Sequence, residues 1–258
     1  MFLLDRVALV TGAGRGIGRS IAIGCALEGA KVALLARSRE ELESVAGTVR
    51  TMGRHALPIP CDITRPEEVE AALARVRTEW GPPLVLVNNA GISPSARIED
   101  TTDEVWARVL DLNLSAAFRL CRATVPAMIG TGWGRIVNIS STAGKVGYPY
   151  TTAYTASKHG LVGLTRALAK ETVKKGVTVN AVCPGFADTR MTVDSVERIS
   201  RKTGRTVADS RLALESMSPL GRLVTPDEVA HVVLWLLREE AAAVTGQAIH
   251  VDGGEIQA

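Results

Sequence analysis

The sequence predicts an α/β fold built as a single domain around a doubly wound parallel sheet with helices on both faces. Short apolar runs alternate with helical segments along the whole chain, and glycine or polar residues follow the ends of these runs. The 258 residues are 46% hydrophobic, which is enough to bury one large core. No linker rich in glycine, proline or serine divides the chain, so one domain is the simplest interpretation.

The apolar runs define the expected strands. Strands are expected at residues 6–10, 31–36, 56–60, 84–87, 135–139, 177–182 and 248–251. Helices are expected to begin at capping motifs at 64–67, 101–104 and 225–228, and near residue 153. The second of these is expected to be a long helix that runs through Asn113 to about Ala123. Right-handed crossovers place the carboxyl ends of all strands on one edge, which is the ligand-binding edge of such sheets.

Residues 191–218 are polar, helix-prone and without a strand pattern. We expect them to form a mobile pair of helices that covers a substrate pocket.

A glycine-rich loop, residues 12–18, follows the first expected strand and precedes a helical segment. Glycine turns tightly and lets a pyrophosphate approach bare N–H groups at the positive end of the helix. The spacing Gly12-x-x-x-Gly16-x-Gly18 differs from the more common Gly-x-Gly-x-x-Gly but keeps the same physics. The loop therefore predicts a Rossmann-type dinucleotide site.

The end of the second expected strand distinguishes the two nicotinamide dinucleotides. A binder of NAD usually places a carboxylate there, on the adenosine ribose, whereas this chain has Ala36 and Arg37. A guanidinium can pair with a 2′-phosphate, and Arg15 in the glycine loop could add a second cation. The sequence therefore favours NADP(H) over NAD(H). The alternative is that both arginines are ordinary solvated surface residues.

Tyr154 and Lys158 lie four residues apart, which places a phenol and an ammonium on one face of a helix. A neighbouring cation stabilises the phenolate, so this pair can serve as a general acid or base near neutral pH. Tyr148 and Tyr150 compete for the role but have no cation four residues beyond them. The alternative is a solvated helix face, which is common for such a pair.

Composition argues against several other classes. The net charge is +3 without a basic run or an aromatic platform, so we expect no nucleic-acid partner. No apolar run is long enough to span a bilayer and no signal-peptide layout is present, so we expect a cytoplasmic protein without membrane contact. The four histidines lack metal spacing, so no catalytic metal is expected. Cys25, Cys61, Cys121 and Cys183 are expected to be reduced core or pocket residues.

Several motifs follow one another in a particular order and spacing. They are Gly12-x-x-x-Gly16-x-Gly18, Asn88-Asn89-Ala90-Gly91, Asn113, Ser141, Tyr154-x-x-x-Lys158 and Pro184-Gly185 with Thr189. In this order and spacing the chain resembles the short-chain dehydrogenase/reductase family over essentially its whole length, and the tail 246–254 is similar as well.

The resemblance implies four catalytic residues. Tyr154 would protonate a carbonyl oxygen while hydride passes from the nicotinamide to the carbonyl carbon, and Lys158 would hold the nicotinamide ribose and lower the Tyr154 pKa. Ser141 would position the reacting oxygen, and Asn113 would hold a water in a proton relay ending at Lys158. Each has a structural alternative: Ser141 could bond its own turn, and Asn113 could be satisfied locally. Asn88 could be purely structural.

The resemblance also implies the cofactor contacts. Asp62 would face the adenine, 89–91 the adenosine side, and 184–189 the carboxamide end. The residues expected to bind the cofactor are Gly12, Arg15, Gly16, Ile17, Gly18, Arg37, Asp62, Ile63, Asn89, Ala90, Gly91, Tyr154, Lys158, Pro184, Gly185 and Thr189.

Within the family, the chain is most similar to 3-oxoacyl thioester reductases and polyketide ketoreductases, in the stretches 141–145, 156–160 and 180–186. Polyketide enzymes carry Pro-Gly-Gly where this chain has 92–95, Ile-Ser-Pro-Ser. Carrier-protein enzymes often have basic residues where this chain has 130–133, although Lys174 and Lys175 supply charge at a second docking site.

The segment 197–214 resembles that of NAD-dependent 3-hydroxybutyrate dehydrogenases. Those enzymes bind a free carboxylate with a histidine and a lysine where this chain has Ala143 and Thr151. The expected substrate is therefore a thioester-bound or neutral small-molecule ketone.

We therefore expect an NADP(H)-dependent reductase that converts a 3-oxoacyl thioester or a similar ketone to a secondary alcohol. One alternative is a dehydrogenase that oxidises a secondary or alicyclic alcohol, and another is a dinucleotide sensor without chemistry. The family resemblance implies a homotetramer formed by helices at about 103–123 and 153–174. The apolar residues Leu110, Leu114, Phe118 and Leu161 of these helices could form the interface or could equally belong to the core.

Overall fold

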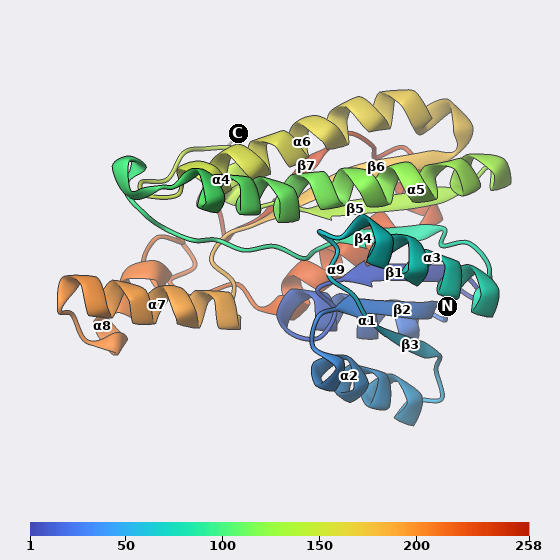
Figure 1. The fold of residues 1–258 in the computed structure, drawn as a ribbon, viewed down its shortest axis with the longest axis horizontal. Helices are drawn as coiled ribbons and strands as arrows, with labels where there is room; N and C mark the ends of the chain where they lie inside the picture. Colours follow the sequence, from blue (N-terminus) through green and yellow to red (C-terminus); the bar gives the residue numbers. More distant parts are fainter. Residues whose placement is uncertain (258) are drawn as a thin grey trace.

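The computed structural model describes residues 1–257, in which seven parallel strands form one sheet in the order β3-β2-β1-β4-β5-β6-β7 (Figure 1). The strands are β1 (Val7–Thr11), β2 (Lys31–Ala36), β3 (Ala56–Pro60), β4 (Val85–Asn88), β5 (Gly134–Ile139), β6 (Val177–Pro184) and β7 (Ala248–Val251). Every strand expected from the sequence is present within a residue or two at each end. The α/β fold with a doubly wound parallel sheet is confirmed.

Nine α-helices connect and cover these strands within the described residues. They are α1 (Gly16–Leu27), α2 (Arg39–Thr51), α3 (Pro66–Trp80), α4 (Asp103–Leu110), α5 (Ala116–Thr131), α6 (Thr152–Thr172), α7 (Arg190–Thr203), α8 (Val207–Glu215) and α9 (Pro226–Leu236). The helices α1, α2 and α9 contribute to one core cluster, and α3, α5 and α6 contribute to the other, on the opposite face of the sheet. The sheet is therefore the middle layer of three (Figure 1).

Strand β1 shows why the sheet is central. All five of its residues are buried, and Ala8 and Val10 join one core while Val7 and Leu9 join the other. A strand covered on both faces has a continuous apolar run rather than an alternating one. β1 pairs with β2 on one side and with β4 on the other, so the chain reverses its direction of winding at β1 and β4. The glycine loop follows β1 at this switch point.

Two of the three predicted helix starts differ from the structure in detail. Thr225 and Glu228 form the predicted capping box of α9. At α3, Pro66 occupies the first helical position as expected, but the N-cap is Arg65 without a side-chain bond. The predicted capping box at 64–67 is wrong because the Thr64 hydroxyl donates to Asp62 instead, at 2.7 Å. At α4 the capping residue is Thr102, whose hydroxyl accepts from Val105 N.

The long helix expected from 101 through Asn113 to about 123 is present as a continuous helical stretch, but it is not α-helical throughout. The structure has α4, then a π-helical turn at Asp111–Ser115, then α5, which extends to Thr131. A π turn carries one extra residue per turn and commonly marks a functional position in a helix. Here it contains Asn113.

The segment expected to form two helices contains α7 and α8, which extend away from the sheet at its carboxyl edge (Figure 1). None of the helices in residues 1–257 combines the length and apolar character that a bilayer crossing requires. All four cysteines are buried and unpaired, as predicted.

Candidate active site

The glycine loop forms a tight cradle between β1 and α1. Gly12 and Gly16 have positive φ angles of 62° and 53°, which L side chains rarely adopt. A Cβ on Gly18 would lie 2.2 Å from the Gly12 carbonyl oxygen, so only glycine fits there. The loop leaves the first N–H groups of α1 facing the carboxyl edge, and Ile17 is half-buried in its first turn. This bare backbone fits the pyrophosphate of a dinucleotide.

The amide side chain of Asn89 fixes this loop to β4. Its Nδ2 donates to the carbonyl oxygens of Thr11 and Gly12, at 2.9 and 3.3 Å. The Thr11 hydroxyl in turn accepts from the backbone N–H groups of Asn89 and Ala90, at 2.9 and 3.1 Å. Thr11 was not among the predicted site residues, because a threonine at a strand end carries no spacing signal.

The predicted relay residue Asn113 contacts the segment that follows β4. It is buried, and its side chain donates to Ile92 O and accepts from Ile92 N, at 3.0 and 2.9 Å. A second bond from its Nδ2 reaches the Ser157 hydroxyl at 3.0 Å. A Cβ on Gly91 would lie 3.1 Å from Asn113 Oδ1 and 3.6 Å from Lys158 Nζ. The structure therefore brings Gly91, Asn113 and Lys158 together.

Ser141 follows β5 and adjoins Tyr154 of α6. The Ser141 hydroxyl accepts from Ala143 N at 3.1 Å, which holds the turn Thr142–Gly144. A hydrogen bond with the Ser141 side chain lowers the pKa of Tyr154, while burial, the larger influence, raises it. The net pKa of the Tyr154 phenol is raised, the direction opposite to the one expected from the lysine spacing.

Lys158 does not offset this effect of burial. Its Nζ donates to the Ile139 carbonyl at 2.8 Å and lies 5.7 Å from the centre of the Tyr154 ring. Burial lowers the pKa of Lys158 to about 8. The ammonium is therefore turned toward the end of β5 and only partly available to the phenol. It retains two of its three donors for other partners.

The predicted adenosine contacts lie at the ends of β2 and β3. The Asp62 carboxyl accepts from Thr64, which is the main cause of its lowered pKa, and the Arg37 guanidinium adds to the effect. Ile63 beside it is buried, and Arg37 is exposed. Arg15 at the start of α1 is also exposed and forms an ion pair with Glu41 of α2, 3.1 Å between Arg15 Nη1 and Glu41 Oε1. Sequence spacing does not indicate this partner.

The opposite end of the site is formed by β6 and the segment that follows it. Gly185 follows Pro184, and its N–H donates to Val251 O at 3.1 Å. Thr189 occupies the N-cap position of α7 without a side-chain capping bond, and it lies near the glycine loop, since a Cβ on Gly16 would lie 3.2 Å from Thr189 Cγ2. The predicted residues of the carboxamide end and of the glycine loop are therefore close in space.

Two more residues border this end: Tyr148, which the sequence suggested only as a competing acid, and Glu255, which sequence reasoning missed. Tyr148 donates a hydrogen bond to the Glu255 carboxylate. A Cβ on Gly185 would lie 2.9 Å from Glu255 Oε2. The pair is 107 residues apart in the chain, so no local pattern could reveal it.

The side chain of Asn88 makes structural contacts inside the protein, as the alternative interpretation of the sequence suggested. Its Nδ2 donates to Asn138 Oδ1 at 2.8 Å, and Asn138 donates to the Thr165 hydroxyl at 2.8 Å. This buried amide chain ties β4 and β5 to α6. Within the described residues no group of three or more His, Cys, Asp or Glu side chains could hold a metal ion.

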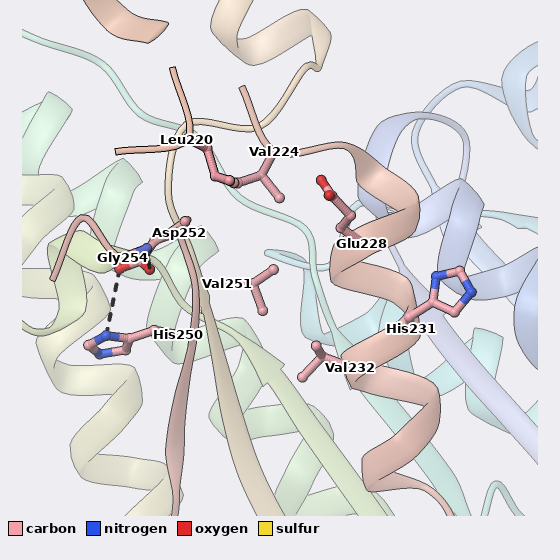
Figure 2. A pocket seen from close by; sticks show the side chains of 10 residues that line it. Leu220, Val224, Glu228, His231, Val232, His250, Val251, Asp252 and Gly254 are labelled. Carbon is pink, nitrogen blue, oxygen red and sulfur yellow. Dashed lines mark hydrogen bonds and ion pairs between the residues drawn. The ribbon is translucent and has the colours of Figure 1, made fainter. Parts of the chain in front are cut away.

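A cavity of about 480 Å³ lies elsewhere, between α9 and β7 (Figure 2). Glu228, His231 and Val232 border it from α9, and His250 and Val251 border it from β7. The predicted catalytic residues do not line this cavity.

Known proteins match nearly the whole chain. A family model described as enoyl-(acyl carrier protein) reductase matches residues 12–255. The 3-oxoacyl-(acyl-carrier-protein) reductase FabG of Pseudomonas aeruginosa is 41% identical over 254 residues, covering 98% of both chains. The D-beta-hydroxybutyrate dehydrogenase of Rhizobium meliloti is 36% identical over 256 residues, covering 97% of this chain and 98% of that protein.

A crystal structure of a single-residue variant of the actinorhodin polyketide ketoreductase with NADPH superimposes with a TM-score of 0.94 at 42% identity, covering 97% of each chain. The fold and these matches define an oxidoreductase. The chain belongs to the short-chain dehydrogenase/reductase family.

Proposed function

We propose that this protein is an NADPH-dependent reductase that converts a 3-oxoacyl thioester to the 3-hydroxyacyl thioester. The observation that carries the proposal is the pairing of the Ser141 and Tyr154 hydroxyls at the carboxyl edge of the sheet, one helical turn from Lys158. Two neighbouring hydroxyls suit a ketone oxygen. The names of the FabG relative and of the ketoreductase structure support the same chemistry.

The raised pKa of Tyr154 suits the reductive direction. A phenol that stays protonated at neutral pH can donate its proton to the ketone oxygen, while Ser141 donates a hydrogen bond that positions this oxygen. Bound NADPH would supply the hydride to the carbonyl carbon. Lys158, with two free donors, would hold the nicotinamide ribose hydroxyls and return a proton to Tyr154. Asn113, which donates to Ser157 beside it, would hold the water that passes a proton on to Lys158.

The dinucleotide would lie along the strand ends, from Asp62 and Ile63 past the glycine loop to Gly185 and Thr189. The bare loop backbone fits its pyrophosphate, and Arg15 and Arg37 support a preference for NADPH because each can pair with a 2′-phosphate. No carboxylate stands at the end of β2, where an NAD-binding site of this fold usually has one.

A free 3-hydroxy acid is the second candidate substrate, because a relative bearing the name of such a dehydrogenase is 36% identical. The pocket argues for the thioester. Ala143 is buried and uncharged, and Thr151 bonds the Tyr148 carbonyl and the Thr155 hydroxyl, so neither supplies a cation for a carboxylate.

Oxidation of NADPH on adding acetoacetyl-CoA tests the proposal. We expect turnover with the thioester and little with acetoacetate, and tighter binding of NADPH than of NADH by the fluorescence of the bound reduced nicotinamide. Turnover of acetoacetate alone would favour the free-acid enzyme, and oxidation of alcohols alone would favour a dehydrogenase. Binding without turnover of any ketone or alcohol would favour a sensor.

We also propose a cytoplasmic homotetramer, and that α7 and α8 cover the bound substrate. Four buried, unpaired thiols suit a reducing compartment. Trp106 of α4 and Phe118 of α5 are 40% and 46% exposed, which suits an interface on these helices.

A further inference from the structure

The two arginines proposed to recognise a 2′-phosphate differ in their surroundings. Arg37 is exposed at the end of β2, and its charge acts on Asp62. The Arg15 guanidinium, in contrast, is already bonded to a carboxylate, with 3.1 Å between Arg15 Nη1 and Glu41 Oε1. A negative charge therefore stands beside the cation of the glycine loop, at the place where a phosphate dianion would have to bind.

The fold places Glu41 there by specific contacts. Ser38 caps α2, and its hydroxyl accepts from the backbone N–H of Glu41, at 3.2 Å. Gly14 then leaves room for the side chain, because a Cβ on residue 14 would lie 2.8 Å from Glu41 Cβ and 3.0 Å from Glu41 Oε2. The glycine loop and the first turn of α2 thus pack directly on each other. The hydrogen bond from the Glu41 backbone to Ser38 fixes the position of Glu41, and the absence of a side chain on Gly14 lets Glu41 pack against the loop.

We infer that Glu41 is a specificity-determining residue that limits the preference for NADPH by occupying Arg15. The inference rests on the proposed function, in which Arg15 and Arg37 recognise the 2′-phosphate. A guanidinium bonded to a carboxylate has less of its charge and fewer of its donors available to a second anion. The same carboxylate has no such effect on NADH, which carries a hydroxyl at the 2′ position. Glu41 therefore narrows the difference in affinity between the two dinucleotides.

Binding measurements on Glu41→Gln test the inference. Glutamine keeps the size of the side chain and an acceptor for Arg15 but removes the negative charge. We expect the dissociation constant of NADPH to fall by about threefold to fivefold, the range of single exposed charge contacts, and that of NADH to stay the same. The fluorescence of the bound reduced nicotinamide reports both constants without turnover. The gain should shrink at high salt, because exposed charges are screened.

Glu40→Gln is the matched control. Glu40 is the preceding residue of the same helix turn and is exposed, so its replacement makes the same change in net charge without touching the Arg15 contact. We expect it to change the NADPH constant much less. An equal gain in both variants would overturn the inference, because a general charge effect would then explain it. Weaker NADPH binding in Glu41→Gln would overturn it too, since Glu41 would then be orienting Arg15 for the phosphate.

A double-variant cycle with Arg15→Gln separates a route through Arg15 from direct repulsion of the phosphate. We expect Glu41→Gln to have little effect on NADPH binding once Arg15 is replaced. An undiminished gain would contradict the route through Arg15. The proposed function fails independently: wild-type protein that binds NADPH no more tightly than NADH contradicts the cofactor preference, whatever Glu41→Gln does.

Discussion

Tyr148 donates a hydrogen bond to Glu255 and so joins the loop before α6 to the C-terminal segment. Hydrogen bonds within the C-terminal segment fix the backbone on either side of Glu255: the Asp252 carboxylate accepts from the N–H groups of Gly254 and Ile256, both at 3.0 Å. Ser218, after α8, donates to Asp252 O at 3.0 Å. The C-terminal segment therefore connects the α7–α8 region to the loop that precedes Tyr154.

The Tyr148–Glu255 pair predicts a pH dependence of stability. Burial raises the pKa of Glu255, opposed by the bond from Tyr148, and the neighbouring Asp252 raises it further. An acid whose folded pKa is raised contributes stability below its unfolded pKa, ordinarily 4.5, and loses it as pH rises through the folded value. Glu255→Gln stays neutral, so its melting temperature relative to wild type should rise from acidic to neutral pH. A pH-independent difference in thermal unfolding would contradict this assignment.

Replacing Tyr154 by Phe removes the proposed acid. We expect kcat to fall by at least about 100-fold with NADPH binding nearly unchanged, because proton transfer contributes to the transition state and the ring remains. Steady-state kinetics and cofactor fluorescence check the two parts. Tyr150→Phe is the control, since Tyr150 is 62% exposed and should leave kcat unaltered. A Tyr154→Phe enzyme with ordinary kcat would refute the assignment.

Lys158 predicts the alkaline limit of activity. Burial lowers its pKa from 10.5 to about 8, so its ammonium is lost above that pH. If the charge holds the ribose and supports Tyr154, kcat/KM for ketone reduction should decline above pH 8. The free energy of unfolding should instead increase as pH rises from 8 to 10.5. In this range Lys158 is neutral in the folded protein but still charged in the unfolded chain, so burying it costs less as pH rises. A pH profile that stays flat to pH 10 would contradict the requirement for the ammonium.

Gly18, which is tightly packed, and Gly47, which has open space around it, together test the role of the glycine loop. Gly18→Ala forces a Cβ to 2.2 Å from the Gly12 carbonyl, so we expect a loss of about 1–3 kcal/mol in stability and of dinucleotide binding. Gly47→Ala in α2 meets no atom within 4 Å and should stabilise the protein by about 0.5–1 kcal/mol. Denaturant unfolding and NADPH titration check both. Normal cofactor binding by Gly18→Ala would show that the loop is not the cradle.

The oligomer is open to a direct test. If α4 and α5 form the interface, Phe118→Lys should dissociate the tetramer, because it buries a charge in an apolar contact. Sedimentation velocity measures the assembly. Leu161→Ala does not serve this purpose, since Leu161 is 1% exposed and belongs to the core. A wild-type protein that sediments as a monomer would remove the prediction altogether.

The sequence by itself determined the layers and the position of the site. The strands can be recognised as short apolar runs that end at glycine or polar residues, because a parallel strand buried on both faces must be apolar throughout. Parallel strands also have their carboxyl ends at one edge of the sheet, which is where the ligand binds. Gly18, Asn89 and Ser141 could be placed for this reason. They follow strand ends, and strand ends share an edge.

Only the tertiary structure decided what each group contacts. Arg15 meets Glu41, Tyr148 meets Glu255, and the π turn at Asn113 appears where one long helix was expected. The pKa of Tyr154 is raised, whereas its spacing from Lys158 suggested a lowered pKa, because the effect of burial is larger than that of the cation. Spacing along a chain fixes which residues share a face. Desolvation and partners from distant segments depend on packing, and packing is a property of the folded chain.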